Sequence, residues 1–566
     1  MKTSLVILLL LLSVNFTFAQ EKVYQISFSS HLAAETGRAD SAGLVLAARK
    51  IKNQLLAEGY LLANIDQLDF AADTLRAQIY VGERYRWAAL GVSNIPEEML
   101  SKAGYRQRDF DGVTFSGRAF NRLVSKLLGL AANNGYPFAN LQLQHVSIRG
   151  THLKAILRYE PGPVINYDTL AIAPAGLIKR EFLENYLHLR PGTPFQLPQV
   201  ENIANAINRL PYCRLVDSTR LKFANNLCAI SLQVAPVKAN KIDALLGFLP
   251  NQTNDNGLLL TGYVNLHLQN LFRSGKELSF VWRQFKQESQ KLYFLYRHPN
   301  LLRSPVGLQV NFNLLKQDSS FLNTDFTLAG FYQQKKTEVA FTAVFKSSRA
   351  LAITRDSLAV PEFADFTLRQ LGARVTYSGL GNTINPRQGA KGYVEVKVGG
   401  KKIKPDPRVA EAVYDSINLA PAQMEVTVGG EVNQRLTGPL VAHIDASYGQ
   451  VLNNDQLFTN DLLRLGGVNS LRGFNELDIF VSTYLLARLE ARIIMNMNSR
   501  VFVFYDQAFT WNNVGNSRDT PFGFGAGMVL DTGAGELQLV YALGVSAQQS
   551  LSLSQSKIHI GYVARF

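Results

Sequence analysis

From about residue 240 to the C-terminus, apolar and polar side chains alternate with a period of two. Such alternation is typical of β-strands that turn one face to an apolar phase and the other to a polar one. About twenty residues per strand and connection leave room for strands of about 9–11 residues, the length that crosses a bilayer. Sixteen alternating runs can be counted, beginning near residues 241, 258, 276, 291, 306, 321, 337, 364, 391, 422, 438, 480, 500, 521, 535 and 556.

The lengths of the connections distinguish a membrane barrel from a soluble β-sandwich or propeller. Even-numbered connections are short, as at 333–336 and 496–499, whereas odd-numbered ones such as 399–421 and 449–478 are long. A sandwich has no reason to produce this parity, but outer-membrane barrels combine short periplasmic turns with long outer loops. The pattern therefore predicts a barrel of 16 antiparallel transmembrane strands over residues 240–566. Its apolar side chains would face lipid and its polar side chains the lumen.

The N-terminal part of the chain contains a repeat. Tyr60, Tyr136 and Tyr212 are 76 residues apart in both intervals. Each follows an amphipathic helical stretch and precedes two β-like runs; the stretches are 44–56, 120–130 and 200–210. A single Gly-Tyr pair could be an ordinary helix C-cap, but constant spacing favours a repeated strand-helix-helix-strand-strand module. We expect three α+β modules, at residues 20–84, 85–162 and 163–239.

The first nineteen residues have the pattern of a signal peptide. Lys2 precedes the apolar run from Leu5 to Leu12, and Thr17 and Ala19 supply the small residues of a cleavage site. The alternative is an uncleaved membrane anchor, but the run is short for a bilayer. We therefore expect residues 1–19 to be removed on export.

Charge and motif content argue against two broad classes of function. The net charge is +14, from 58 Lys+Arg and 44 Asp+Glu, but the basic excess is spread over both halves of the chain, so no nucleic-acid partner is expected. The 8 His residues form no H-x-x-x-H pair, and the chain has no G-x-S-x-G motif, no Walker loop and no metal-spaced cysteines. We expect no catalytic residue, no metal site and no cofactor.

Both cysteines, Cys213 and Cys228, lie in the third repeat. Export to an oxidising compartment would permit a disulfide between them. If the hairpin turn lies near residues 224–226, however, Cys213 is opposite residue 237 and Cys228 opposite residue 222, an offset beyond disulfide reach. The sequence therefore predicts two buried free thiols.

One long connection carries a motif that resembles a known family. Its pattern G-G-x-x-S-x-R-G-F, built from Gly466, Gly467, Ser470, Arg472, Gly473 and Phe474, resembles the hallmark of the BamA/TamA outer-membrane assembly superfamily. The 76-residue modules resemble POTRA domains, so the resemblance covers the whole mature chain, and the three-module layout is most similar to TamA.

Other segments resemble family motifs in the same order along the chain. They are the N-P-x-x-G turn at Asn385–Gly389, the E-x-R strand at Leu489–Arg492 and the F-x-D-x-G motif at Phe504–Ala508. Ala508 replaces the usual glycine, and Asn382 stands where related sequences often have Asp. These departures leave the expected fold intact but put the local geometry at Ala508 in question.

Alternation assigns faces to the charged side chains of the twelfth and thirteenth strands. Arg488, Glu490 and Arg492 share one face, and Phe502, Phe504 and Asp506 share another; their neighbours suit lipid, so these faces line the lumen. Arg472 on a loop folded inward would meet Glu490, Asp506 and the ring of Phe504. We predict that this contact tethers the loop. From spacing alone a surface Arg-Gly-Phe turn fits equally well, and the resemblance favours the tether.

The resemblance also implies a function. It implies a non-enzymatic factor of the outer membrane that inserts or translocates outer-membrane proteins, with its N-terminal domains in the periplasm. Its lateral gate would be the seam between strands at 241–249 and 556–566, and Gly561, Tyr562 and Phe566 resemble a C-terminal β-signal, although an ordinary last strand has the same pattern. The implied partners are unfolded outer-membrane protein clients, the lipid bilayer, and periplasmic or inner-membrane proteins bound by the POTRA-like modules.

Two other transport functions remain open. A two-partner-secretion transporter of the same superfamily would export one soluble substrate, but such proteins typically carry two POTRA domains after a plug helix. A passive porin explains the barrel, yet it leaves the three repeats and the Arg-Gly-Phe loop without a role.

Overall fold

The computed structural model describes residues 22–29, 35–39, 41–70, 74–250, 258–286, 288–334, 336–352, 360–380, 385–496, 498–532 and 535–566. The expected signal peptide and Asn382 lie outside these residues. The chain divides into two compact units. One combines Met1–Tyr167 with Gly192–Pro198 and Phe223–Cys228, and the other combines Asp168–Pro191, Gln199–Lys222 and Ala229–Phe566. No helix among the described residues is long and apolar enough to cross a membrane.

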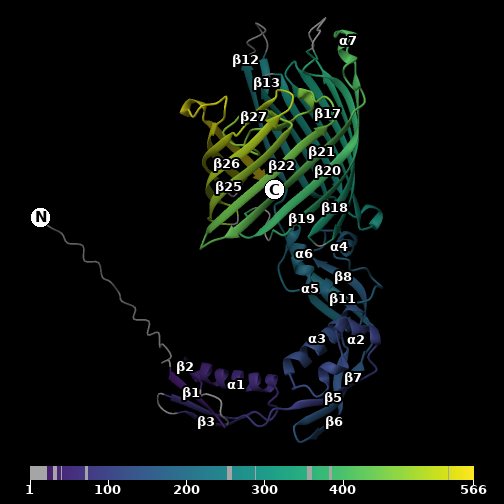
Figure 1. Cartoon of the computed structure of the whole chain (residues 1–566), viewed down its shortest axis with the longest axis vertical. Coiled ribbons are helices and arrows are strands. Elements are labelled where there is room, and N and C mark those ends of the chain that lie inside the picture. The colour runs from purple at the N-terminus through teal and green to yellow at the C-terminus, as the bar shows by residue number, and fades with distance from the viewer. Residues whose placement is uncertain are drawn as a thin grey trace, which may run out of the picture. The chain divides into compact units, whose positions relative to one another are not determined.

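The first module is a four-stranded sheet with one helix (Figure 1). Its elements are β1 (Lys22–Phe28), β2 (Glu35–Ala39), α1 (Ser41–Glu58), β3 (Asn64–Phe70) and β4 (Thr74–Tyr80), and the strand order is β2-β1-β4-β3. Ile26, Ile51 and Ile79 belong to its buried core. The expectation of two helices is wrong for the described residues of this module, because the segment before α1 forms β2, which pairs antiparallel with β1.

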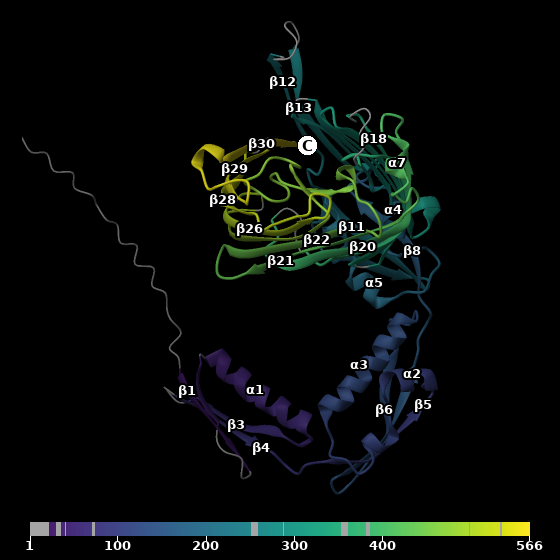
Figure 2. The same cartoon turned by 45° about the horizontal axis from the view of Figure 1, so that its top comes forward.

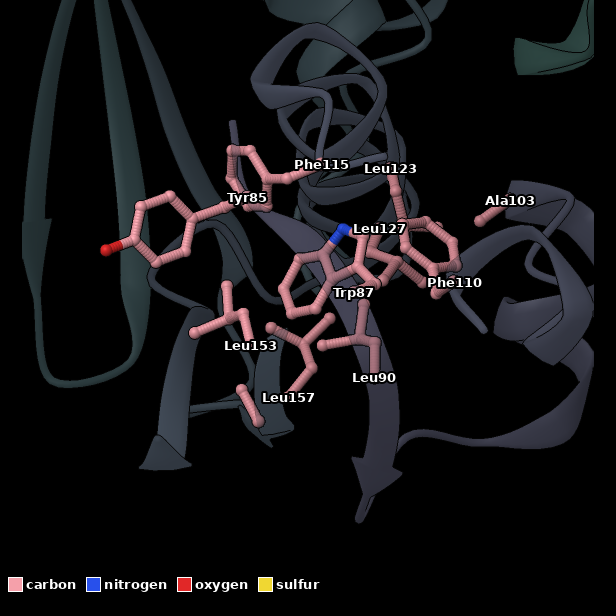
Figure 3. Close-up of a cluster of buried hydrophobic side chains, with 11 residues drawn as sticks. Tyr85, Trp87, Leu90, Ala103, Phe110, Phe115, Leu123, Leu127, Leu153 and Leu157 are labelled. Atoms are coloured by element: carbon pink, nitrogen blue, oxygen red, sulfur yellow. The ribbon is translucent and has the colours of Figure 1, made fainter. Parts of the chain in front are cut away.

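The second module has the expected order of strand, helix, helix, strand, strand. It contains β5 (Arg86–Ser93), α2 (Glu97–Ala103), the 3-10 turn η1 (Gln107–Phe110), α3 (Gly117–Asn133), β6 (Asn140–Arg149) and β7 (His152–Glu160). The sheet order is β5-β7-β6. Trp87 is at the centre of its core, 1% exposed and with its ring centroid 5.1 Å from that of Phe115 (Figure 3). Burying such large rings supplies much of the apolar area that a module of this size needs.

The third module has a broken helix in place of the continuous one expected at 200–210. Its elements are β8 (Asn166–Ala173), α4 (Arg180–Tyr186), α5 (Leu197–Glu201), α6 (Ile203–Arg209), β9 (Cys213–Leu215), β10 (Arg220–Ala224) and β11 (Leu227–Pro236). Asn202, a weak helix former, separates α5 from α6. Cys213 is opposite Pro236, one residue from the expected partner, and both cysteines are free and buried, as predicted.

Sixteen antiparallel strands close into a barrel (Figure 1), which confirms the predicted fold class. They are β12 (Lys241–Pro250), β13 (Leu258–Leu271), β14 (Lys276–Lys286), β15 (Ser289–His298), β16 (Val306–Gln317), β17 (Phe321–Gln334), β18 (Thr337–Ala350), β19 (Asp365–Ser378), β20 (Gly389–Lys404), β21 (Ala422–Arg435), β22 (Leu440–Asn453), β25 (Thr483–Ile494), β26 (Arg500–Asn512), β28 (Phe522–Asp531), β29 (Gly535–Val545) and β30 (Lys557–Arg565). The three-residue β27 (Ser517–Asp519) extends the wall beside β26.

The strands begin close to the predicted positions but run further than expected. The predicted start nearest β25 is residue 480, and the strand begins at Thr483. Strand lengths range from 9 residues in β30 to 16 in β20, instead of about 9–11. The excess arises because β20 and its neighbours continue as paired strands into the segments that the sequence assigned to long loops.

The two faces of the wall separate as the alternation predicts. Phe341, Leu371 and Ile560 are 70%, 74% and 69% exposed, whereas Glu425, Asn433 and Arg492 on other strands are buried. Apolar side chains therefore cover the outside, and polar side chains line the lumen. One connection enters this lumen: the yellow-green chain between β22 and β25 lies inside the ring of strands in Figure 2.

Candidate functional site

The connection between β22 and β25 holds the Arg-Gly-Phe motif in a tight loop. The motif lies between two short paired strands, β23 (Leu463–Leu465) and β24 (Ile479–Val481). The Ser470 hydroxyl accepts a hydrogen bond from the Gly466 amide at 2.8 Å and donates one to the Gly466 carbonyl at 2.9 Å. Gly466 and Gly467 have φ of 113° and 95°, a region that favours glycine, and a Cβ on Gly466 would lie 2.1 Å from the Asn475 carbonyl oxygen.

Arg472 projects from this loop onto two carboxylates of the barrel wall. Its Nε and Nη2 donate to the two oxygens of Asp506 on β26, at 2.8 and 2.6 Å. Its Nη1 donates to Glu490 on β25 at 2.6 Å, and its backbone amide donates to Asp506 at 3.2 Å. The guanidinium carbon lies 3.7 Å from the ring centroid of Phe504. The structure thus brings together the four residues that the sequence indicated for the tether.

The tether is almost completely removed from solvent. Arg472 is 4% exposed and Asp506 is 0% exposed. A bidentate arginine–carboxylate pair is the geometry in which a buried ion pair offsets most of its desolvation cost. Glu490 is shared, because its other oxygen accepts from Nε of Arg492 at 2.6 Å. Removing one partner would leave a buried charge unpaired, which typically costs roughly 3–5 kcal/mol.

Glycines on β28 make room for the loop and for the phenylalanine rings beside it. A Cβ on Gly523 would lie 2.0 Å from the Arg472 carbonyl oxygen, and one on Gly525 would lie 2.9 Å from the Phe504 ring. Gly473 has φ of 92°, and a Cβ there would lie 2.6 Å from the Gly544 amide nitrogen. The glycine-rich run on β28 therefore marks close packing between the wall and the loop.

The apolar part of the motif fills the space behind the tether. Leu471 and Phe474 are 0% and 5% exposed, and they belong to a cluster that includes Leu486 and Ala508. Ala508 is itself 0% exposed. The Ala508 methyl group is thus packed into this cluster, so alanine fits at a position where the resemblance implied glycine.

The seam between the first and last strands is short. Among the described residues, β12 pairs with β30 through two residue pairs, Lys241 with Arg565 and Ile242 with Ala564. On their other sides, β12 makes ten pairs with β13 and β30 makes eight with β29. Within this part of the structure, Asp243–Pro250 of β12 therefore pairs on one side only.

The residues that resemble a β-signal lie on the last strand of this seam. Gly561 and Tyr562 belong to β30, and Tyr562 and the terminal Phe566 are 43% and 55% exposed. The Phe566 amide donates to the Asn240 carbonyl at 3.1 Å, so the chain ends beside the beginning of β12.

A family model described as the Omp85 superfamily domain matches residues 270–566. The chain belongs to the Omp85 superfamily. As a closed barrel of this family, it is an outer-membrane protein. No curated protein matches the sequence.

Two solved structures share the fold of this Omp85 protein at low sequence identity, and a third is a weaker match. CdiB from Escherichia coli is 13% identical with a TM-score of 0.54, covering 93% of this chain and 97% of that one. CdiB from Acinetobacter baumannii is 13% identical with a TM-score of 0.55, covering 85% of this chain and 90% of that one. BamA from Haemophilus ducreyi lacking POTRA domains 1–3 is 12% identical with a TM-score of 0.44, covering 86% and 99%.

The Omp85 barrel contains further contacts around the tether that the sequence did not predict. Arg488 on β25 donates to Asp445 on β22 at 3.0 Å and to the Asn469 carbonyl of the loop at 3.1 Å. Gln549 donates to the carbonyls of Gly473 and Gly544 at 3.2 and 2.9 Å. Alternation indicates the face of each strand but not its register against the next strand, so the partners on β22 had no signal in the sequence.

A second anchor holds the same connection earlier in the chain, before the Arg-Gly-Phe motif. Asp461, in the 3-10 turn η3 (Thr459–Asp461), pairs with Lys401 of β20, and both side chains are 0% exposed. Asn460 donates to the Ser348 hydroxyl and to the Ala364 carbonyl at 2.6 and 2.7 Å. The β22–β25 connection is therefore fixed at two places, and the sequence predicted only one of them.

The N-P-x-x-G turn is also tied to the wall. Asn385 is 3% exposed and accepts a hydrogen bond from Nη1 of Arg500 at 2.5 Å, and Gly389 has φ of 118°.

Within the described ranges, no three His, Cys, Asp or Glu side chains are grouped so that they could hold a metal ion.

Proposed function

We propose that this Omp85 protein inserts β-barrel proteins into the outer membrane, with the β12–β30 seam as the place where a client strand enters. The observation that carries the proposal is the two-pair seam. A strand whose edge is unpaired is a template for another strand, since its N–H and C=O groups need partners. Asp243–Pro250 offers such an edge within the wall of a membrane barrel.

The anchored loop favours a client path through the seam rather than through a central pore. Arg472 and Asp461 hold the β22–β25 connection inside the lumen and at the end of β20. A passive porin would need that space for solute. The proposal therefore assigns transport to the wall of the barrel, and it assigns to the three N-terminal modules, in the periplasm, the receipt of unfolded clients.

A disulfide across the seam tests the proposal. Ile242 and Ala564 are directly opposite each other, so Ile242→Cys with Ala564→Cys would lock the seam when oxidised. The matched control is Leu539→Cys with Ile560→Cys, which bridges the fully paired β29 and β30. We expect the oxidised seam variant to lose outer-membrane protein assembly in cells and to regain it with reductant, while the control stays active. Full activity of a seam variant whose disulfide is complete would rule out entry through the seam.

Depletion of the protein separates insertion from export of one soluble substrate. Loss of many barrel proteins from the outer membrane is the expected result, measured by quantitative proteomics of the membrane and the culture medium. Loss of a single secreted protein would instead favour the two-partner-secretion function, and unchanged membranes with slower solute uptake would favour a porin.

A further inference from the structure

Four basic side chains lie together on the outer face of the barrel wall, on the neighbouring strands β18, β19 and β20 (Figure 1). The exposed Phe345, Leu371 and Val398 mark the outward face of these three strands. Side chains two residues apart share a face, so the same face becomes basic where the strands end remote from residue 240. This basic patch consists of Arg349 on β18, Arg369 on β19, and Lys402 and Lys404 on β20.

The basic patch begins at the edge of the apolar band. Phe326 on β17 and Phe345 are directly opposite each other and exposed, with ring centroids 6.4 Å apart. Aromatic side chains of this kind form the girdles that flank the apolar band of an outer-membrane barrel. Arg369 is paired with Phe345, and Lys402 is four residues beyond the apolar Val398. The patch therefore lies at the depth of lipid headgroups.

The charges of the patch are not used within the protein. All four basic side chains are exposed, and within the described part of the chain none of them forms an ion pair. One acid, Asp365, lies on the same face opposite Lys404, and its Oδ1 accepts a hydrogen bond from the Ala350 amide at 2.6 Å. Four positive charges against one negative charge leave an excess that is available to an anion.

The outward face elsewhere on the wall lacks such charges. On β25, β26 and β30 this face is marked by the exposed Leu489, Val503 and Ile560, and along these three strands it carries no charged residue. Lysine and arginine side chains that only reach for water at a membrane surface need no particular neighbours. Their concentration on three adjacent strands is instead typical of a surface that recognises anionic headgroups.

We infer that the basic patch binds the phosphate groups of a lipid of the outer leaflet that carries more than one phosphate. Arg369 and Lys402 are diagonal neighbours, about 7–8 Å apart, so one phosphate can accept charge-assisted hydrogen bonds from both. Arg349 is four residues beyond Phe345, which pairs with Arg369, so it lies about 13 Å from Arg369 along the wall. One phosphate cannot span that distance, and a second one would lie near Arg349 and Lys404.

The assignment to the outer leaflet rests on the proposed position of the N-terminal modules in the periplasm, and the site itself does not depend on entry of a client through the seam. β19 and β20 are the eighth and ninth of the sixteen strands, so the patch lies across the barrel from the β12–β30 seam. A lipid bound there would hold the part of the wall that stays closed while the seam opens.

Two forms of one lipid test the inference on the full-length protein in dodecyl maltoside, an uncharged detergent. The probes are bis-phosphorylated lipid A and monophosphoryl lipid A with the same acyl chains. Native mass spectrometry over a range of lipid concentrations measures each dissociation constant. We expect the bis-phosphorylated form to bind about tenfold more tightly, because only it presents a phosphate to both ends of the patch.

A pair of matched double variants assigns the binding to the patch. Arg369→Gln with Lys402→Gln should weaken binding of bis-phosphorylated lipid A by at least about tenfold. The control, Lys336→Gln with Arg518→Gln, removes the same charge from exposed positions outside the patch and should bind as the wild type does. Arg369→Lys with Lys402→Arg keeps both charges and should retain most of the affinity. Glutamine is polar and fits exposed positions, and circular dichroism checks that each barrel has assembled.

Each other outcome would overturn the inference. Unchanged binding by the Arg369→Gln, Lys402→Gln variant would remove the site, and equal weakening by the control variant would show that only net charge matters. Equal affinity of the wild type for the two forms of lipid A would overturn recognition of a second phosphate. The seam disulfide tests the proposed function separately, because it changes neither the patch nor the two lipids.

Discussion

The wall of this barrel differs sharply between its β25–β26 region and its β12–β30 seam. β25 and β26 are joined by twelve residue pairs and carry Glu490 and Asp506, which hold a buried arginine from the lumen. The seam is joined by two residue pairs. One part of the wall is thus fully paired and held by buried ion pairs, and another part has an unpaired strand edge. A barrel that must admit a strand without unfolding needs both, because local opening is confined to where stability is lowest.

The largest expected effect comes from breaking the tether. Arg472→Ala leaves Asp506 buried and unpaired, so the free energy of unfolding should fall by roughly 3–5 kcal/mol. Urea unfolding of the refolded barrel in detergent micelles measures the loss. A double-mutant cycle with Asp506→Ala should show that the second substitution costs much less once Arg472 is absent. Strict additivity of the two substitutions would mean that the contact contributes nothing.

A smaller effect is expected from adding a methyl group to the glycine-rich run on β28. In Gly523→Ala the new Cβ would lie 2.0 Å from the Arg472 carbonyl oxygen, so the loop must shift. Overpacking of this kind typically costs about 1–3 kcal/mol. Gly330→Ala on β17 is the control, because a Cβ there meets nothing within 4 Å. The same urea titration checks both variants, and equal stabilities would show that the loop is not pressed against β28.

The seam should differ from the tethered region in its exchange of amide hydrogens, with no substitution at all. We expect amides of Asp243–Ala244 in β12 to exchange at least about tenfold faster than those of Leu489–Ala491 in β25, which have strand partners on both sides. Deuterium uptake of the protein in nanodiscs, followed by mass spectrometry, measures this difference. Equal protection of the two segments would remove the contrast between seam and tether.

The sequence predicts the tethered region of the wall better than it predicts the seam. Alternation placed Glu490 and Asp506 on the lumenal face because a strand's period fixes which side chains share a face. The contacts of Arg488 with Asp445 and of Lys401 with Asp461 depend on strand register and loop paths, which alternation does not contain. The shortness of the seam also had no signal, because it depends on how far two strands distant in sequence overlap.

The same distinction holds in the N-terminal modules. The spacing of Tyr60, Tyr136 and Tyr212 predicted a repeated module, and the helix before each tyrosine is present. Repetition did not predict how far each copy departs from the pattern. In the first, β2 replaces a helix by pairing with β1, and in the third Asn202 divides α5 from α6. Both departures depend on whether a short segment forms a helix or another structure, and a period of 76 residues does not determine that choice.

The smallest expected effect is the reaction of the two native cysteines with thiol reagents. Their slow reaction also allows the result of the seam disulfide experiment to be assigned to the introduced cysteines. Burial raises the pKa of Cys213 to about 12 and that of Cys228 to about 11. A raised pKa lowers the fraction of reactive thiolate at any pH below it, so both native thiols should alkylate very slowly at pH 8. Mass spectrometry after iodoacetamide treatment should find almost no modification in the folded protein and two modifications after denaturation. Rapid labelling of the folded chain would show that the third module opens, and the cysteine pairs at the seam would then need a Cys213→Ala, Cys228→Ala background.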